Sequence, residues 1–230
     1  MRNTNTGYKP LLWILVIPVL NIFYGILNHG GPNVVSLTTD LDERIPFVPA
    51  FIIPYLIWYP FILAMLIVFF IKMRRVYYQT LITLCLGLVA CYITYYFYQT
   101  VIIRPTITGD GFINWLVSLV YSDNPYNCFP SIHVLTSYLM LKGMSDCTTL
   151  SKTSRLLIFI TSWTIIISTL FVKQHFLLDI AGAILLAEVL YFVVGKLLPV
   201  QAESKQSVVT DREENSMIGD VIEIKGDKVV

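Results

Sequence analysis

Residues 50–71, AFIIPYLIWYPFILAMLIVFFI, form a long apolar stretch that contains no charged side chain. A helix that crosses the hydrocarbon core of a bilayer needs about 20 consecutive apolar residues, because each residue adds about 1.5 Å to a path of about 30 Å. The stretch has this length, and the basic residues of KMRR at 72–75 follow it directly. It therefore predicts a transmembrane helix.

Five further segments of the chain have the same character. The 230-residue chain is 56% hydrophobic and 13% charged, whereas soluble domains average about 25% charged residues. The six predicted spans are residues 11–28, 50–71, 77–102, 131–147, 155–173 and 176–198. We therefore expect an all-α fold, a bundle of six transmembrane helices over residues 1–198, followed by a disordered cytoplasmic tail at 199–230.

Basic residues are unevenly distributed between the two sides of this bundle. With a cytoplasmic N-terminus, the inner side carries Arg2, Lys9, Lys72, Arg74, Arg75, Lys142, Lys152, Arg155 and Lys196. The outer side keeps Arg44, Arg104 and Lys173. By the positive-inside rule, this predicts a multi-pass plasma-membrane protein with both termini in the cytoplasm.

The overall charge limits the classes of partner that we expect. The net charge is +1 and no basic residues form a concentrated patch, which argues against a nucleic-acid partner. The expected surroundings are the lipid bilayer, and the sequence gives no indication of the oligomeric state.

Residues that carry chemistry are concentrated in three short stretches. These are Arg104-Pro105, Cys128-Phe-Pro-Ser-Ile-His133 and Lys173-Gln-His175-Phe-Leu-Leu-Asp179. Each lies at the end of a predicted span, and the alternating direction of the spans places all three at the extracytoplasmic ends of the helices. Ionisable groups are costly at membrane depth, so the cluster is a candidate functional site.

The histidines and the carboxylate of these stretches fit nucleophilic catalysis. His175 and Asp179 are four residues apart at the start of a predicted helix, so they share one face. The carboxylate can accept one imidazole N–H, which fixes the tautomer and leaves the other nitrogen free to attack. His133 comes from another helix and is a candidate general acid.

The remaining polar residues of the stretches fit the binding of phosphate. The Arg104 guanidinium matches the geometry of phosphate oxygens. Ser131 follows Pro130 and is expected to cap a helix, whose first N–H groups favour an anion. Lys173 adds a further positive charge near His175.

We assign no catalytic role to the polar residues between the first two predicted spans. Asp40, Asp42 and Glu43 are expected to form a solvated acidic loop, with a gate for lipid access as the alternative. His29 lies in a Gly/Pro-rich segment, and we interpret it as structural.

Together, the three stretches resemble the motifs of the membrane lipid phosphate phosphatases (type-2 phosphatidic acid phosphatases), which share their site with the vanadium haloperoxidases. The family pattern is Lys-x6-Arg-Pro, Pro-Ser-Gly-His and Ser-Arg-x5-His-x3-Asp on six membrane helices. The matching residues here are Arg104-Pro105, Pro130-Ser131-Ile132-His133 and Ser168-Thr169-x5-His175-x3-Asp179. The resemblance covers about residues 97–185.

The resemblance implies a function and a set of site residues. It implies hydrolysis of a membrane lipid phosphate, phosphatidic acid-like or polyprenyl, without a metal or another cofactor. His175 would form a phosphohistidine, Asp179 would orient it, and His133 would be the acid. Arg104 and Ser131 would hold the phosphate.

Three positions depart from the family pattern. The lysine of the first motif falls on Phe97, the glycine of the second on Ile132, and the arginine of the third on Thr169. Two expected phosphate-binding cations are therefore absent. We hypothesise that Lys173 compensates for one of them.

Three alternatives remain open at the level of sequence. The Cys-Phe-Pro-Ser-x-His and Lys-Gln-His-x3-Asp variants resemble the branch of the inositol phosphorylceramide synthases, which transfer the phosphoryl-containing group to an alcohol. His133, His175 and Asp179 also match a two-histidine, one-carboxylate metal site. The third alternative is a non-catalytic lipid transporter or structural membrane protein.

Overall fold

The computed structural model describes residues 7–198 of the protein, so the predicted tail at 199–230 lies outside the described residues. The described part is all-helical, as predicted, and its β-structure is limited to two isolated bridges. The helices are η1 (Lys9–Leu15), α1 (Val16–Leu27), α2 (Asp40–Arg44), η2 (Pro49–Phe51), α3 (Ile52–Lys72), α4 (Arg74–Phe97), α5 (Phe112–Tyr121), α6 (Ile132–Asp146), α7 (Lys152–Phe171) and α8 (Leu177–Leu197).

Five helical segments are long and apolar enough to cross a membrane, which is compatible with a multi-pass membrane protein. They correspond to five of the six predicted spans: Lys9–Leu27, Pro49–Lys72, Arg74–Phe97, Lys152–Phe171 and Leu177–Leu197. Mean hydropathy in these segments lies between 1.6 and 2.3. The pattern of apolar runs therefore identified these helices correctly.

The predicted span at 131–147 differs from the other five. The structure has a helix there, α6, but it comprises only 15 residues, which gives a length of about 22 Å. That is shorter than a hydrocarbon core of about 30 Å. The helix begins after its N-cap, Ser131, and ends with the polar residues Ser145 and Asp146, before its C-cap, Cys147.

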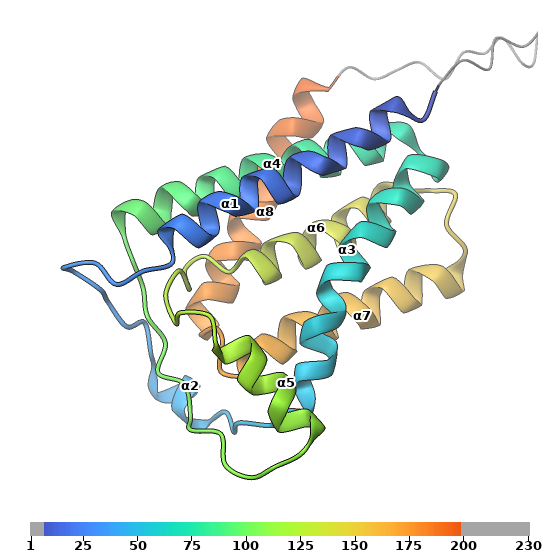
Figure 1. The fold of residues 1–230 in the computed structure, drawn as a ribbon. Helices are drawn as coiled ribbons and strands as arrows, with labels where there is room; N and C mark the ends of the chain where they lie inside the picture. Colours follow the sequence, from blue (N-terminus) through green and yellow to red (C-terminus); the bar gives the residue numbers. More distant parts are fainter. Residues whose placement is uncertain (1–6, 199–230) are drawn as a thin grey trace, which may run out of the picture. The chain divides into compact units, whose positions relative to one another are not determined.

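The short helix α6 lies at the centre of the bundle (Figure 1) and packs against α3, α4, α7 and α8. Leu135, Leu139 and Met140 on α6 are completely buried. Gly87 of α4 permits close approach, because a Cβ there would lie 2.7 Å from Cδ2 of Leu135. The core of the bundle is thus built around α6, which carries His133 in its first turn.

Helix α1 lies on the outside of the bundle, beside α4 in Figure 1. None of its residues is buried. Its outward side chains are nevertheless apolar, with Val19, Ile22 and Ile26 each exposed by 58–61%. Large exposed apolar side chains along a helix are typical of a surface in contact with lipid.

The connections that carry α2 and α5 lie at one end of the bundle (Figure 1). At this end α4 and α7 finish, and α6 and α8 begin. Helix α5 packs on η2 and α3, where Val117 is completely buried near Tyr55 and Val172. These connections form the surroundings of the predicted site residues.

Candidate active site

His175 lies in the short connection between α7 and α8 and is 8% exposed. Its Nδ1 is 3.0 Å from the carbonyl oxygen of Cys128 and 3.2 Å from Oδ2 of Asp179. Both neighbours are hydrogen-bond acceptors, so Nδ1 carries the proton in the neutral ring. The tautomer assigned in this way leaves a lone pair on Nε2.

Asp179 lies in the first turn of α8 and is completely buried. Its Oδ2 accepts a hydrogen bond from the backbone N–H of Phe176 at 2.8 Å, in addition to its contact with His175. The carboxylate is therefore held behind the imidazole by backbone that precedes the helix. The structure places this pair as the four-residue spacing predicts.

His133 faces His175 from the first turn of α6, with 5.8 Å between the two ring centroids. Its imidazole stacks on Tyr55 at a centroid distance of 4.5 Å and contacts Trp58 at 4.2 Å. Both aromatic residues belong to α3. Helix α3 therefore sets the orientation of the His133 ring.

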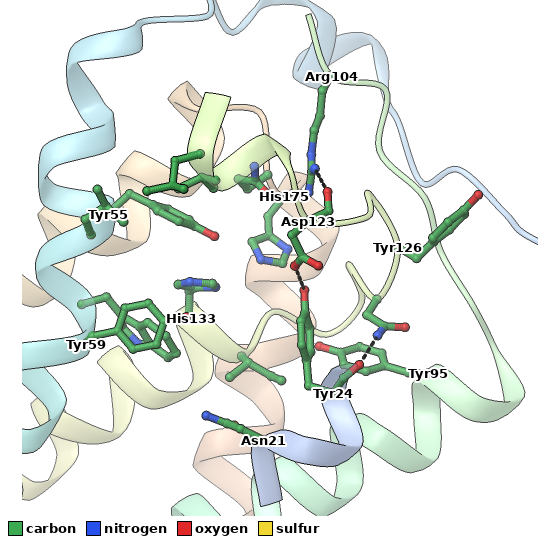
Figure 2. Close-up of a pocket in the computed structure, with 17 residues that line it drawn as sticks. Asn21, Tyr24, Tyr55, Tyr59, Tyr95, Arg104, Asp123, Tyr126, His133 and His175 are labelled. Atoms are coloured by element: carbon green, nitrogen blue, oxygen red, sulfur yellow. Dashed lines mark hydrogen bonds between the residues drawn. The ribbon is translucent and has the colours of Figure 1, made fainter. Parts of the chain in front are cut away.

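The two histidines and Arg104 line one cavity of about 470 Å³ (Figure 2). Its volume is in the range of small-molecule sites, which is about 300–1,000 Å³. The lining residues come from five helices and from the connections between helices: Asn21, Tyr24, Tyr55, Leu56, Trp58, Tyr59, Tyr95, Arg104, Leu119, Val120, Asp123, Tyr126, Asn127, Ile132, His133, Gln174 and His175. Arg104 is the one lysine or arginine in this set.

The guanidinium of Arg104 is held at the wall of the cavity. It donates to the carbonyl oxygen of Asp123 and, at 2.9 Å, to Oε1 of Gln174. Its Nε is buried and has no hydrogen-bond partner among the described residues. The charge is therefore fixed at the site by neighbouring backbone and by the residue that precedes His175.

Ser131, predicted to bind phosphate, does not line the cavity. It is completely buried, and its Oγ accepts from the backbone N–H of Val134 at 3.3 Å. Its predicted function as the N-cap of α6 is thus observed. The side chain contributes by fixing the start of the helix on which His133 lies.

Lys173 also lies outside the cavity that contains His133. Its Nζ donates to the carbonyl oxygens of Asp42 at 2.9 Å and Ile45 at 2.6 Å. It lines a second cavity of about 540 Å³, which Arg104 and His175 also border. The structure therefore gives Lys173 a contact with the end of α2 that sequence analysis did not foresee.

The two positions of the missing family cations do not reach the cavity either. Phe97 is 80% exposed at the end of α4. Thr169 is completely buried in α7, where its Oγ1 donates to the carbonyl oxygen of Ile166. Arg104 is left as the cation that faces both histidines.

Several polar residues of the cavity were not predicted from the sequence. Figure 2 shows the hydroxyl of Tyr55 pointing into it toward His175. Asp123 accepts from Tyr24 at 3.1 Å and from Asn28 at 2.6 Å, which ties α1 to the connection before α6. The position of Gln174 next to His175 in the sequence could have indicated that it belongs to the site. Tyr55 could not be singled out, because it is one of many aromatic residues in an apolar span.

Cys128 contributes its backbone and not its thiol. Its carbonyl oxygen accepts from His175, while the side chain is 2% exposed. Burial raises the pKa of the Cys128 thiol, so the sulfur stays protonated at neutral pH. A thiolate nucleophile at this position is therefore disfavoured.

The metal-site alternative requires His133, His175 and Asp179 to converge on one point. Asp179 Oδ2 instead lies beside Nδ1 of His175 and not beside the free Nε2. Within residues 7–198, no three His, Cys, Asp or Glu side chains are grouped so that they could hold a metal ion. The arrangement of donors favours the orienting role of Asp179 over metal ligation.

Comparison with known proteins found no match among protein-family models, curated proteins or solved structures. The family suggested by the three motifs therefore stays a prediction. The chemistry of the site is therefore argued from the positions and contacts of its own residues.

Proposed function

We propose that the protein is an integral membrane phosphatase that hydrolyses lipid phosphate monoesters or pyrophosphates through a phosphohistidine on His175. The observation that carries this proposal is the environment of His175. Both contacts of its Nδ1 are acceptors, and the ring borders a cavity shared with His133 and Arg104. A nucleophile, an acid and an anion-binding cation therefore meet in one place.

In the first chemical step, Nε2 of His175 attacks the phosphorus and the bond to the ester oxygen breaks. His133 donates a proton to the departing oxygen, and the lipid alcohol leaves. Asp179 stabilises the positive charge that develops on the imidazole. Arg104 stabilises the negative charge on the phosphoryl oxygens.

In the second step, water attacks the phosphorus from the side on which the alcohol left. His133, now neutral, takes a proton from the water, and the phosphorus–nitrogen bond breaks. Inorganic phosphate leaves, His175 regains its free Nε2, and His133 regains its proton. The acceptor therefore has to occupy the same cavity as the leaving group.

The lining of the cavity also supports a second candidate, transfer to an alcohol instead of water. Asn21, Asn127 and the carboxylate of Asp123 line the cavity in addition to Arg104 and the histidines. Such amide and carboxylate groups can bind the hydroxyls of a polyol. The same phosphohistidine would then be attacked by an alcohol oxygen.

We also propose that the protein crosses the membrane six times, with α6 as the short sixth crossing and both termini cytoplasmic. Its central position between four longer helices supports this, because protein and not lipid surrounds it. The candidate active site would then face the outer side of the plasma membrane. The distribution of lysine and arginine supports that orientation.

An apolar groove next to the cavity supports an amphiphilic substrate. Its volume is about 390 Å³, and it shares four lining residues with the cavity: Asn21, Trp58, Tyr59 and Ile132. Its other walls are apolar side chains of η1, α1, α3 and α4, together with Thr136 of α6. Along α3 it extends from Trp58 to Leu66, which is about 12 Å. A lipid chain in this groove would place its phosphate beside His175.

Filling this groove should weaken binding of long-chain substrates. We expect Ile17→Trp, inside the groove, to raise KM for a long-chain lipid phosphate about tenfold, since displacing two methylenes costs about 1.6 kcal/mol. Hydrolysis of soluble p-nitrophenyl phosphate should be unchanged. Val19→Trp is the matched control, because Val19 lies on the exposed face of α1 and not in the groove. Equal KM values for both variants would contradict this account.

Phosphate release by the detergent-purified protein in excess EDTA tests the proposed function. The panel contains phosphatidic acid, a phosphatidylglycerophosphate and a polyprenyl pyrophosphate, each with and without glycerol or inositol. Release that survives EDTA supports the phosphatase. Phosphoryl transfer that requires the added alcohol supports the second candidate. Activity that is lost in EDTA and restored by a divalent metal would contradict both.

A further inference from the structure

Helix α2 holds both ends of the segment that contains His175. At one end, Nζ of Lys173 donates to the carbonyl oxygens of Asp42 and Ile45. At the other end, the backbone N–H of Leu177 donates to Oδ1 of Asp42 at 2.8 Å. The partners are 128–135 residues apart in the sequence, so these are tertiary contacts.

Asp42 is oriented for this contact. The residue is 4% exposed, whereas its polar neighbours in the sequence predict a solvated loop. Oδ2 accepts from the backbone N–H of Thr39 at 3.0 Å and from its Oγ1, so Oδ1 points at Leu177. A buried carboxylate is costly unless donors satisfy it, and here three donors do so.

Lys173 adopts a backbone conformation that needs support. Its φ is +48°, in the left-handed region, which is uncommon for a residue with a side chain. This conformation turns the chain out of α7 immediately before His175. The contacts of Nζ with the carbonyl oxygens of Asp42 in α2 and of Ile45, the C-cap of α2, offset that cost and hold the turn.

We propose that Asp42 and Lys173 are positioning residues that hold the 173–177 segment so that His175 points at the substrate. This inference rests on the proposed function. Other supports of the segment include the carbonyl oxygen of Thr169 on α7, which accepts from the N–H groups of Gln174 and His175, the carboxylate of Asp179 on α8, and Arg104, which donates to Gln174. Helix α2 supplies a further support, from the connection between α1 and α3.

The contribution of these contacts should be large, because reactions depend strongly on alignment. A displacement of about 1 Å costs about 100-fold in rate. Loss of the Asp42 contact should therefore lower kcat about 30–100-fold and leave KM within about twofold. A phosphate ligand would behave differently, because its loss would weaken the binding of inorganic phosphate.

The first test compares Asp42→Ala, Asp42→Asn and Asp40→Ala. Asp42→Ala should show the fall in kcat, and Asp42→Asn should recover part of it, because the amide oxygen can still accept from Leu177 although the amide nitrogen cannot accept from Thr39. Asp40 is the matched control, an exposed aspartate two residues earlier in the same helix. Unchanged kcat in Asp42→Ala, or an equal loss in Asp40→Ala, would overturn the proposal.

The second test separates positioning from phosphate binding at Lys173. In Lys173→Met, kcat should fall at least about tenfold while the inhibition constant of inorganic phosphate stays within about twofold. An inhibition constant that rises tenfold with unchanged kcat would show Lys173 to be a phosphate ligand instead and would overturn the proposal.

A third measurement is independent of activity. Amide hydrogen exchange of the 173–177 segment should accelerate in Asp42→Ala and stay unchanged in Asp40→Ala. If the wild-type protein releases no phosphate from any substrate, the proposed function is wrong, while exchange still reports whether α2 holds the segment. Unaltered exchange in Asp42→Ala would overturn the positioning role.

Discussion

Replacing His175 with alanine should lower phosphate release from a lipid phosphate by at least about 10⁴-fold, because the substitution removes the Nε2 that attacks the phosphorus and neither Cys128 nor Asp179 is placed to replace it. The Cys128 thiol is buried and protonated, and Asp179 lies behind the ring. The measurement is release of inorganic phosphate by purified protein in EDTA. Size-exclusion chromatography should show that the variant remains folded.

His29 provides the matched control for this substitution. It is an exposed histidine in the connection between α1 and α2, and it does not line the cavity. His29→Ala should keep the activity of the wild-type protein. Activity that persists in His175→Ala would exclude a phosphohistidine at this position.

Replacing His133 with glutamine should lower turnover of an alkyl phosphate about 10²–10⁴-fold, because the departing alcohol then lacks its proton donor. The loss should depend on the leaving group. An activated aryl ester needs little protonation, so its first step should remain fast, while hydrolysis of the phosphohistidine slows. We therefore expect a rapid burst of aryl alcohol, stoichiometric with the protein, followed by slow turnover.

Burst amplitude distinguishes acid catalysis from a structural role of His133. Tyr55 and Trp58 contact the ring, so its loss also changes packing. A packing defect would slow the first step for alkyl and aryl esters alike and would give no burst. That outcome would remove His133 from the mechanism.

Much of the fold could be predicted from the sequence, because a segment that crosses lipid has to be a helix of about 20 apolar residues. Apolar runs of bilayer length indicate helices, and five of them are present as predicted. The alternation of their direction also predicts that Arg104, His133 and His175 meet, which the shared cavity shows. The length of α6 could not be read in this way, because burial among helices makes a 15-residue helix look like a span.

The surroundings of the site depend on tertiary contacts that local pattern does not encode. The polar neighbours of Asp42 in the sequence predict a solvated residue, whereas in the fold it is buried and accepts a hydrogen bond from Leu177, 135 residues away. In the sequence, Lys173 has no evident partner. In the fold, its Nζ donates to the carbonyl oxygens of Asp42 and Ile45. Ser131 was predictable as a helix cap, because that role depends on the residues next to it.

Direct detection of the intermediate tests the central claim of this account, that Nε2 of His175 attacks the phosphorus. The His133→Gln variant is mixed with an activated aryl phosphate, quenched in alkali, in which phosphohistidine is stable, and analysed by mass spectrometry. We expect a phosphoryl group on His175, stoichiometric with the burst and absent when His175 is also replaced by alanine. Aryl alcohol released without a phosphoryl group on His175, or with the group on another residue, would contradict it.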